Sequence, residues 1–169
     1  AEPDYDNANL IIMWGANPLD SHRPGEGAAY PQSQQVLARA RRRGAKIVAV
    51  DPFRTPTVRL AHDWIRLNPG TDLALLLAMI HVIIAEDLFD GEFISTWVEG
   101  FDALREHVRE NTPEWASSIT GVPSDQITAL AREYATTRPA AIRDGNGLDM
   151  HTDVVAATQA LGILTVITG

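Results

Sequence analysis

Two short apolar runs, separated by a segment with helical spacing, begin the pattern of hydrophobic and polar positions along the chain. Residues 10–14 (LIIMW) and 46–50 (KIVAV) are continuous rather than alternating, as in parallel strands that are buried on both faces. Between them, residues 32–43 place apolar side chains on one face of a helix that ends before Gly44. Strand, helix and strand in this order predict one right-handed βαβ unit.

The rest of the chain predicts two more strands and a series of helices. A third strand is expected at residues 64–67 and a fourth, weaker one at residues 140–143. The expected helices cover residues 73–86, 91–98, 101–110, 113–119, a segment opened by Pro123, and residues 152–166. Because strands and helices alternate, the sequence predicts a single α/β domain over residues 1–169. We expect an open, mostly parallel, Rossmann-like sheet with helices on both faces.

Every predicted strand ends in a turn that is rich in glycine, proline or polar residues. In an open parallel sheet these carboxyl ends line one edge, where ligands bind at the point at which the strand order reverses. Glycine lets the backbone approach a ligand closely, and free N–H groups near helix N-termini suit phosphates. The four strand ends are Gly15-Ala16-Asn17-Pro18, Asp51-Pro52-Phe53-Arg54-Thr55, Pro69-Gly70-Thr71-Asp72 and Gly145-Asn146-Gly147.

Two aspartates at these strand ends allow more than one interpretation. Asp51 stands where a dinucleotide-binding sheet places its ribose-binding acid, but an Asp-Pro pair also initiates turns. Asp72 stands at the start of a helix, where it can be an N-cap, and a carboxylate there could also accept hydrogen bonds from guanine. The G-x-G-x-x-G fingerprint is absent. Spacing alone therefore leaves two alternatives open, nucleotide-type binding and an α/β fold whose strand ends carry turn residues.

Composition removes several classes of function. A net charge of −8 argues against a nucleic-acid partner. The absence of cysteine excludes disulfides, thiolate metal sites and iron–sulfur clusters built from this chain alone. The longest apolar run, residues 73–80, is shorter than the roughly 20 residues that a membrane-spanning helix needs. The scattered histidines, and the lack of a nucleophile elbow or a P-loop, predict no catalyst that is complete within the chain.

Both ends of the chain suggest a segment of a longer protein. It starts at Ala1 rather than Met, and it stops in an apolar stretch at residues 163–169. A segment of this kind exposes apolar helix faces, here those of residues 73–86 and 152–166, and could dimerise through them. Any targeting signal would lie outside this chain, so its compartment stays open between cytoplasm and periplasm.

Several motifs in order resemble the molybdopterin oxidoreductases of the dimethyl sulfoxide reductase family. The motifs are WGANP, VDPFRTPTVRLAHDWIRLNPGTDLAL, TGVPSDQITALAREYATTRPAAI and GNGLDMHTDVVAATQALGILTVITG. The resemblance extends from about Asn9 to the end of the chain. It implies the family's middle α/β domain, which binds one of two molybdopterin guanine dinucleotides in enzymes that hold molybdenum or tungsten. It also implies that the chain contributes half of a cofactor site and performs no catalysis alone.

The resemblance assigns roles to individual residues. The first loop (Trp14, Gly15, Asn17 and Pro18) would lie against the phosphates and the pterin, and the second (Asp51, Arg54 and Thr55) near ribose and phosphate. In the third loop, Gly70 precedes Asp72, which would pair with guanine. Gly147 and His151 belong to a loop that would approach the pterins. No metal ligand is identifiable, and an iron–sulfur cluster would belong only to regions outside this chain, as would the remaining domains of the parent enzyme.

Two other interpretations stay open at this point. Some relatives, such as the large iron–sulfur subunit of respiratory complex I, keep this fold as a non-catalytic scaffold for electron transfer. The chain could also be a stand-alone nucleotide-binding module with a protein partner. The WGANP and PGTD motifs favour a working cofactor site over the non-catalytic scaffold, and the behaviour of the chain in solution would decide on the stand-alone module.

Overall fold

The structure is a computed structural model that describes residues 3–20 and 33–169. Part of the expected loop after the first strand, His22 and the expected helix start at Gln32 lie outside the described residues. The chain divides into two compact units. Unit 1 comprises Ala1–Arg66 and Thr137–Met150, and unit 2 comprises Leu67–Thr136 and His151–Gly169. The expectation of a single domain over residues 1–169 stays a prediction.

Unit 1 is built on a four-stranded sheet whose strand pairs are all parallel. Its strands are β1 (Leu10–Trp14), β2 (Lys46–Val50), β3 (Asp63–Ile65) and β4 (Ala140–Asp144). They lie in the order β3-β2-β1-β4, with Leu10 opposite both Lys46 and Ala140. All five residues of β1 are buried, as the continuous apolar run predicts. The α/β fold class with an open parallel sheet is confirmed.

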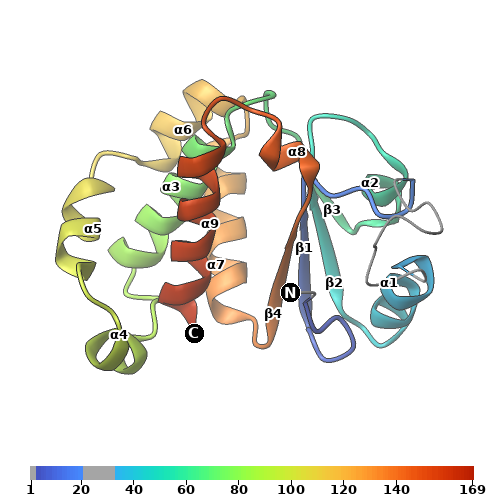
Figure 1. The fold of residues 1–169 in the computed structure, drawn as a ribbon, viewed down its shortest axis with the longest axis horizontal. Helices are drawn as coiled ribbons and strands as arrows, with labels where there is room; N and C mark the ends of the chain where they lie inside the picture. Colours follow the sequence, from blue (N-terminus) through green and yellow to red (C-terminus); the bar gives the residue numbers. More distant parts are fainter. Residues whose placement is uncertain (1–2, 21–32) are drawn as a thin grey trace. The chain divides into compact units, whose positions relative to one another are not determined.

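Two helices of unit 1, α1 (Ser33–Arg42) and α2 (Pro56–Leu60), lie on the same face of the sheet (Figure 1). A core of buried residues fills the space beneath α1: the cluster joins Ile11 and Met13 of β1 and Ile47 of β2 to Val36, Leu37 and Ala40. Sequence reasoning missed α2, because its five residues are too few to show a helical period. Its start is nevertheless well defined. The Thr55 hydroxyl accepts a hydrogen bond from the Val58 N–H, and Pro56 occupies the first helical position.

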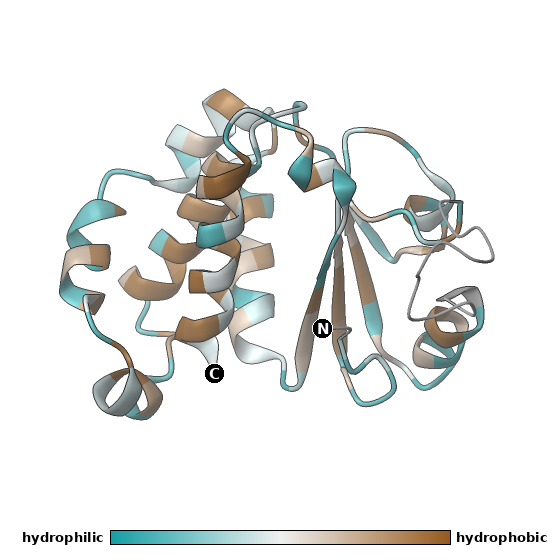
Figure 2. Ribbon diagram, viewed as in Figure 1, coloured by the Kyte–Doolittle hydropathy of each residue, from teal (hydrophilic) through white to brown (hydrophobic). Residues whose placement is uncertain are grey.

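Unit 2 consists of helices in the part that the structure describes. They are α3 (Asp72–Ala85), α4 (Gly91–Trp97), α5 (Phe101–His107), α6 (Pro113–Thr120), α7 (Ser124–Thr136) and α9 (Val154–Thr168). The apolar α3 packs against α6, α7 and α9, and it stands out with α9 in the hydropathy colouring (Figure 2). The expected helix at residues 101–110 ends earlier, at His107, because the chain turns with hydrogen bonds from Arg109 to Glu106 and from Asn111 to Val108.

The remaining differences from the sequence prediction are small. The third strand runs from Asp63 to Ile65 rather than over residues 64–67, because Leu67 is already in the connection to α3. A short helix, α8 (Asn146–Asp149), follows β4 in unit 1, where the glycines indicated only a loop. No helix among residues 3–20 and 33–169 has the length and hydropathy to span a membrane.

Candidate functional site

The carboxyl ends of β1 and β4 meet through glycine backbones in unit 1. The strand order places the reversal point at β1, which has β2 on one side and β4 on the other. A Cβ atom added to Gly15 would lie 2.8 Å from the Leu148 nitrogen and 3.0 Å from the Gly147 Cα. A Cβ added to Gly145 would lie 2.6 Å from the Gly15 carbonyl oxygen. Side chains at these positions would therefore force the two strand ends apart.

Hydrogen bonds fix this glycine contact. The Gly15 N–H donates to the Val50 carbonyl at 2.9 Å, and the Gly147 N–H donates to the Gly15 carbonyl at 3.1 Å. The Gly145 N–H donates to the Trp14 carbonyl at 3.0 Å, so the ladder between β1 and β4 continues into the loops. Gly15 also has a φ of +57°, which favours glycine over any other residue. The glycines of WGANP and GNG thus have a structural role in joining the strand ends.

These hydrogen bonds reduce the number of backbone groups that could bind a ligand. The backbone N–H groups of Gly15 and Gly147 are already used inside unit 1. The Trp14 side chain is fully buried, at 0% exposure, so this residue positions the loop from within the core. Gly147 itself is exposed. The space next to Gly15, Gly145 and Gly147 is filled by the facing loop.

Asp51 is held in a turn directly after β2. Its Oδ1 accepts a hydrogen bond from the Phe53 N–H at 2.8 Å, and its carbonyl oxygen accepts one from the Trp64 indole N–H at 2.7 Å. The residue is only 8% exposed. The turn role that the Asp-Pro pair allowed is therefore present in the structure. The position at the end of the second strand, which the ribose role requires, is present as well.

Asn17 connects the first loop to the start of α2. Its amide oxygen accepts hydrogen bonds from the Thr57 hydroxyl at 2.8 Å and the Thr57 N–H at 3.3 Å. The Thr57 side chain is fully buried, and Thr55 caps the same helix. The two loops after β1 and β2 are thus tied to one another, and two of the predicted site residues serve as parts of that tie.

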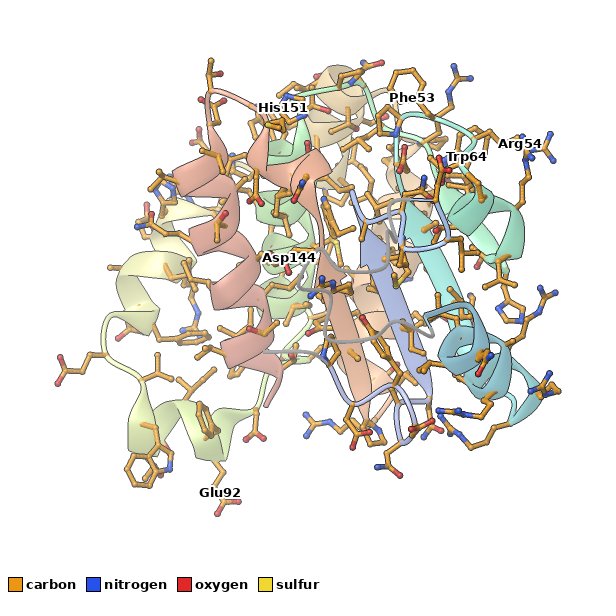
Figure 3. All side chains as sticks on the ribbon, turned by 45° about the vertical axis from the view of Figure 1, so that its right-hand side comes forward. Phe53, Arg54, Trp64, Glu92, Asp144 and His151 are labelled. Carbon is orange, nitrogen blue, oxygen red and sulfur yellow. The ribbon has the colours of Figure 1, made fainter. Side chains whose placement is uncertain are left out.

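Two side chains of the second loop are directed outward (Figure 3). Phe53 is 69% exposed, and Arg54 is also exposed. Trp64 lies at the same edge of the sheet and carries the Arg66 guanidinium at 5.8 Å from its ring centroid. A ring face, a guanidinium and a carboxylate can between them bind a flat base or a sugar phosphate. Sequence reasoning gave no ligand role to Phe53 or Trp64. Phe53 stands two residues after Asp51, whereas nothing in the sequence places Trp64 near it.

Three predicted site residues belong to unit 2. Gly70 has a φ of +77°, and a Cβ added to it would lie 3.4 Å from His151 Nδ1, so the structure brings these two residues together. Asp72 is the first residue of α3 and is 8% exposed. The N-cap position belongs to Thr71, so the N-cap interpretation of Asp72 is wrong by one residue. A carboxylate in the first turn still interacts favourably with the helix dipole.

A groove of about 580 Å³ lies beside the Gly70-Thr71 turn in unit 2. Its apolar floor comes from α3 and α6, and its charged rim comes from the end of α5 and from the residue before α9. The lining includes Leu73, Leu77, Trp115, Glu106, Arg109 and Asp153. Arg109 is paired with Glu106 at 3.5 Å and with Glu110 at 3.7 Å. The groove is therefore a mixed, mainly acidic surface rather than a phosphate site.

The structure groups the candidate residues by unit. Within unit 1 it brings together the loops that contain Gly15, Asn17 and Pro18, Asp51, Arg54 and Thr55, and Gly147. Within unit 2 it brings together Gly70 and His151, with Asp72 two residues from Gly70. Among the described residues, no cluster of histidine and carboxylate side chains could hold a metal ion.

Comparison with known protein families gives a match over nearly the whole chain. The family model described as molybdopterin oxidoreductase matches residues 2–169. Formate dehydrogenase H of Escherichia coli is 39% identical over 98% of this chain and 22% of its own length. The probable oxidoreductase YoaE of Bacillus subtilis is 37% identical over 96% of this chain and 23% of its own length.

A solved structure gives the same result at the level of the fold. The acetylene hydratase from Pelobacter acetylenicus matches with a TM-score of 0.89 and 34% identity, over 98% of this chain and 22% of that protein. The dimethyl sulfoxide reductase DmsA of Escherichia coli, a further relative, is 35% identical over 98% of this chain. The chain thus spans about a fifth of the length of the relatives that it matches.

Proposed function

The chain belongs to the molybdopterin oxidoreductase family, and we propose that it forms half of the binding site for a molybdopterin guanine dinucleotide. Family membership implies a molybdopterin cofactor with molybdenum or tungsten, and the guanine dinucleotide form is part of the proposal. The observation that carries it is the glycine contact at the reversal point of the sheet, with Asp51 at the end of the neighbouring strand. An open α/β sheet binds nucleotides at this place.

The residues present in unit 1 fit such a cofactor in their chemistry. Gly15, Gly145 and Gly147 let the loops after β1 and β4 contact one another through their backbones, because a Cβ atom at any of them would lie within 3.0 Å of the facing loop. Arg54 is an exposed guanidinium, which suits a phosphate, and Phe53 is an exposed ring, which suits a planar group. Asp51 is a carboxylate at the strand end, where vicinal hydroxyls of a ribose are bound in dinucleotide-binding sheets. Asn17 and Thr55 would keep these loops in place through their bonds to α2.

Taken by itself, unit 2 offers one candidate contact to a guanine base. Asp72 is nearly buried in the first turn of α3, and its carboxylate would accept hydrogen bonds from the N1–H and the amino group of guanine. Gly70 leaves room for the His151 ring beside this turn. Bound in the whole enzyme, the cofactor supplies a metal that changes oxidation state by two electrons. The share of this chain is to bind and orient the dinucleotide.

The rest of the parent protein would cover the outer side of α9, which this chain leaves exposed. The exposed side of α9 carries Val155, Ile163 and Val166, which are 69%, 36% and 44% exposed. Relatives are more than four times as long as the chain, so a neighbouring domain is the proposed partner of this face. In the isolated chain the same face would support dimerisation. The isolated chain should also fail to reduce an N-oxide with a reduced dye as electron donor.

Calorimetric titration of the chain with GDP and with ADP tests the half-site. We expect a preference for GDP that Asp72→Asn removes, because the amide cannot accept both hydrogen bonds of the guanine edge. Asp51→Asn should weaken GDP and ADP equally, because both share the ribose. The matched controls are Asp125→Asn, in the first turn of α7, and Asp63→Asn, the first residue of β3.

Three outcomes would contradict the proposal. Absence of binding to both nucleotides would show that the chain carries no preformed half-site. Equal affinity for GDP and ADP would remove the guanine role. A loss of GDP binding in Asp125→Asn as large as that in Asp72→Asn would show that the effect is general to helix starts.

A further inference from the structure

Two aromatic side chains are exposed on one face of α4 in unit 2. Trp97 is 74% exposed and Phe93 is 39% exposed. They are four residues apart on the helix, so they lie on the same face. Tryptophan is the residue most often found among the side chains that dominate protein interfaces, and an exposed one has a large apolar area to bury. Neither residue belongs to the loops of the proposed cofactor site.

The helix that carries this pair is firmly attached to unit 2. Ile94 faces inward and is buried at 7% exposure. The Asp90 carboxylate caps the helix by accepting a hydrogen bond from the Phe93 N–H at 2.9 Å, and the Asp90 N–H donates to the Ile167 carbonyl at 2.8 Å. The aromatic pair is therefore presented on a fixed helix, which lowers the entropy that binding would cost.

The surroundings of the pair are acidic. Between Asp87 and Glu106 the chain has six acidic residues and one basic residue, Arg105. Glu92 precedes Phe93 and points away from the rest of unit 2 (Figure 3), and Glu99 follows Trp97 by two residues. Both glutamates are exposed. An aromatic face with such a rim attracts cations and repels other anions.

The single basic residue of this segment is already bound. The Arg105 guanidinium lies 5.1 Å from the ring centroid of Phe101 and 5.9 Å from that of Phe89, and these two rings are 4.9 Å apart. The guanidinium also lies 3.7 Å from the Asp102 carboxylate. At the neighbouring α5, aromatic rings and a carboxylate thus already bind a guanidinium. The face of Phe93 and Trp97 has the same kinds of groups, aromatic rings and carboxylates.

We propose that Phe93 and Trp97 form a docking surface for a basic, amphipathic segment of a partner protein. The partner's apolar residues would cover the two rings, and its lysine or arginine side chains would meet Glu92 and Glu99. The acidic rim disfavours an anionic membrane and a second copy of the same patch, since like charges would then face each other. This inference is independent of the cofactor site.

Titration with designed peptides tests the docking surface. The probes are a helical leucine–lysine peptide and a leucine–glutamate peptide of the same length. We expect only the leucine–lysine peptide to bind, with a shift of tryptophan emission to shorter wavelength. Trp97→Ala removes the side chain that reports binding, so its affinity is measured by calorimetry; it should weaken binding about tenfold or more, as for a central interface residue. Glu92→Gln combined with Glu99→Gln should weaken it less and reduce its dependence on salt.

Controls separate docking from general attraction to an acidic chain. Val155→Ala removes a comparably exposed apolar side chain from α9, which has no charged residue, and should leave binding unchanged. Circular dichroism melts should show that Trp97→Ala remains folded. The proposal is overturned if Trp97→Ala binds the basic peptide as the unchanged chain does. It is overturned equally if the acidic peptide binds as well. Vesicles of zwitterionic lipid are tested in parallel, and the proposal is also overturned if they shift the tryptophan emission while neither peptide does.

Discussion

The helices α3 and α9 are similarly apolar in composition but differ in how far they are buried. Neither contains Lys or Arg, and apolar residues dominate both. Yet α3 buries ten of its fourteen residues, whereas α9 buries six of its fifteen. Hydropathy therefore shows that a helix must be covered, but it does not show whether the cover belongs to the same chain. For α3 the cover is α6, α7 and α9, and for the outer side of α9 we propose the rest of the parent protein.

The largest expected effect is on the free energy of unfolding, which truncation of a side chain should lower far more in α3 than in α9. Leu76 of α3 is fully buried, whereas Val155 of α9 is 69% exposed. We expect Leu76→Ala to lower the free energy of unfolding by about 2–5 kcal/mol, because it leaves a cavity. Val155→Ala should change it by less than about 0.5 kcal/mol. Urea unfolding followed by circular dichroism measures both, and similar losses would show that the outer side of α9 is covered within the chain.

Charges placed on the outer side of α9 should alter association rather than folding. We expect Ile163→Lys combined with Val166→Lys to weaken self-association of the isolated chain about tenfold, because paired chains would bury unpartnered cations. Sedimentation velocity over a range of concentrations measures this effect. The matched variant is Ile80→Lys in α3, where the side chain is fully buried and the chain should fail to fold. Unchanged association in the α9 variant would assign the dimer contact to another surface.

Sequence reasoning succeeded where a pattern is local. The runs at residues 10–14 and 46–50 predicted β1 and β2 because continuous apolar residues fit strands buried on both faces. The strand ends could be placed at one edge because parallel pairing follows from alternating strands and helices. For α9 the apolar sequence predicted a helix but not how far it is exposed, since burial depends on which other elements pack against the helix.

The candidate site was harder to predict because its contacts join distant parts of the chain. The sequence indicated that Gly15 permits a close approach, and the structure shows that the group approaching it is Gly147. Nothing local to either glycine reveals that pairing. The bond from Asn17 to Thr57 depends on α2, which is too short to predict. The ligand roles of Asp51, Asp72 and the other site residues stay predictions that the nucleotide titrations test.

The contact between α7 and the end of α9 should affect the stability of the chain at alkaline pH. Burial raises the pKa of Tyr134 above its usual value, and a hydrogen bond with Thr168 partly opposes this. Because the folded state holds the proton more tightly, the stability from Tyr134 is full below about pH 10 and is lost as the pH rises through the higher, folded pKa. We expect Tyr134→Phe to flatten the decline of the melting temperature above pH 10.

A second substitution checks the cause of that decline. Thr168→Val removes the hydrogen bond that lowers the pKa of Tyr134, so the pKa of Tyr134 should rise further. The tyrosinate absorbance of Tyr134, taken as the difference from Tyr134→Phe, should then appear at higher pH. A titration curve that Thr168→Val leaves unchanged would mean that Thr168 does not influence Tyr134.

The smallest expected effect comes from an ion pair at the end of α3, for which α9 has no counterpart. The residue after α3, Glu86, accepts two hydrogen bonds from the Arg132 guanidinium of α7 at 2.7 and 2.8 Å, whereas α9 has no charged residue that could do this. The hydrogen bond to Arg132 lowers the pKa of Glu86, with the charge of Arg132 adding to it and burial opposing it. The stability from this pair is therefore present above about pH 4.5 and is lost as the pH falls through the lower, folded pKa.

Melting temperatures between pH 6 and pH 3 measure this contribution. We expect Arg132→Met to lower the melting temperature slightly at pH 6, because exposed ion pairs contribute little to stability, and to lower it less at pH 3, where Glu86 is more fully protonated. Arg109→Met is the matched control, since its ion pairs with Glu106 and Glu110 are longer, at 3.5 and 3.7 Å. If the melting temperatures of both variants change equally with pH, the two hydrogen bonds between Glu86 and Arg132 contribute no extra stability. The difference between α3 and α9 would then come from burial alone.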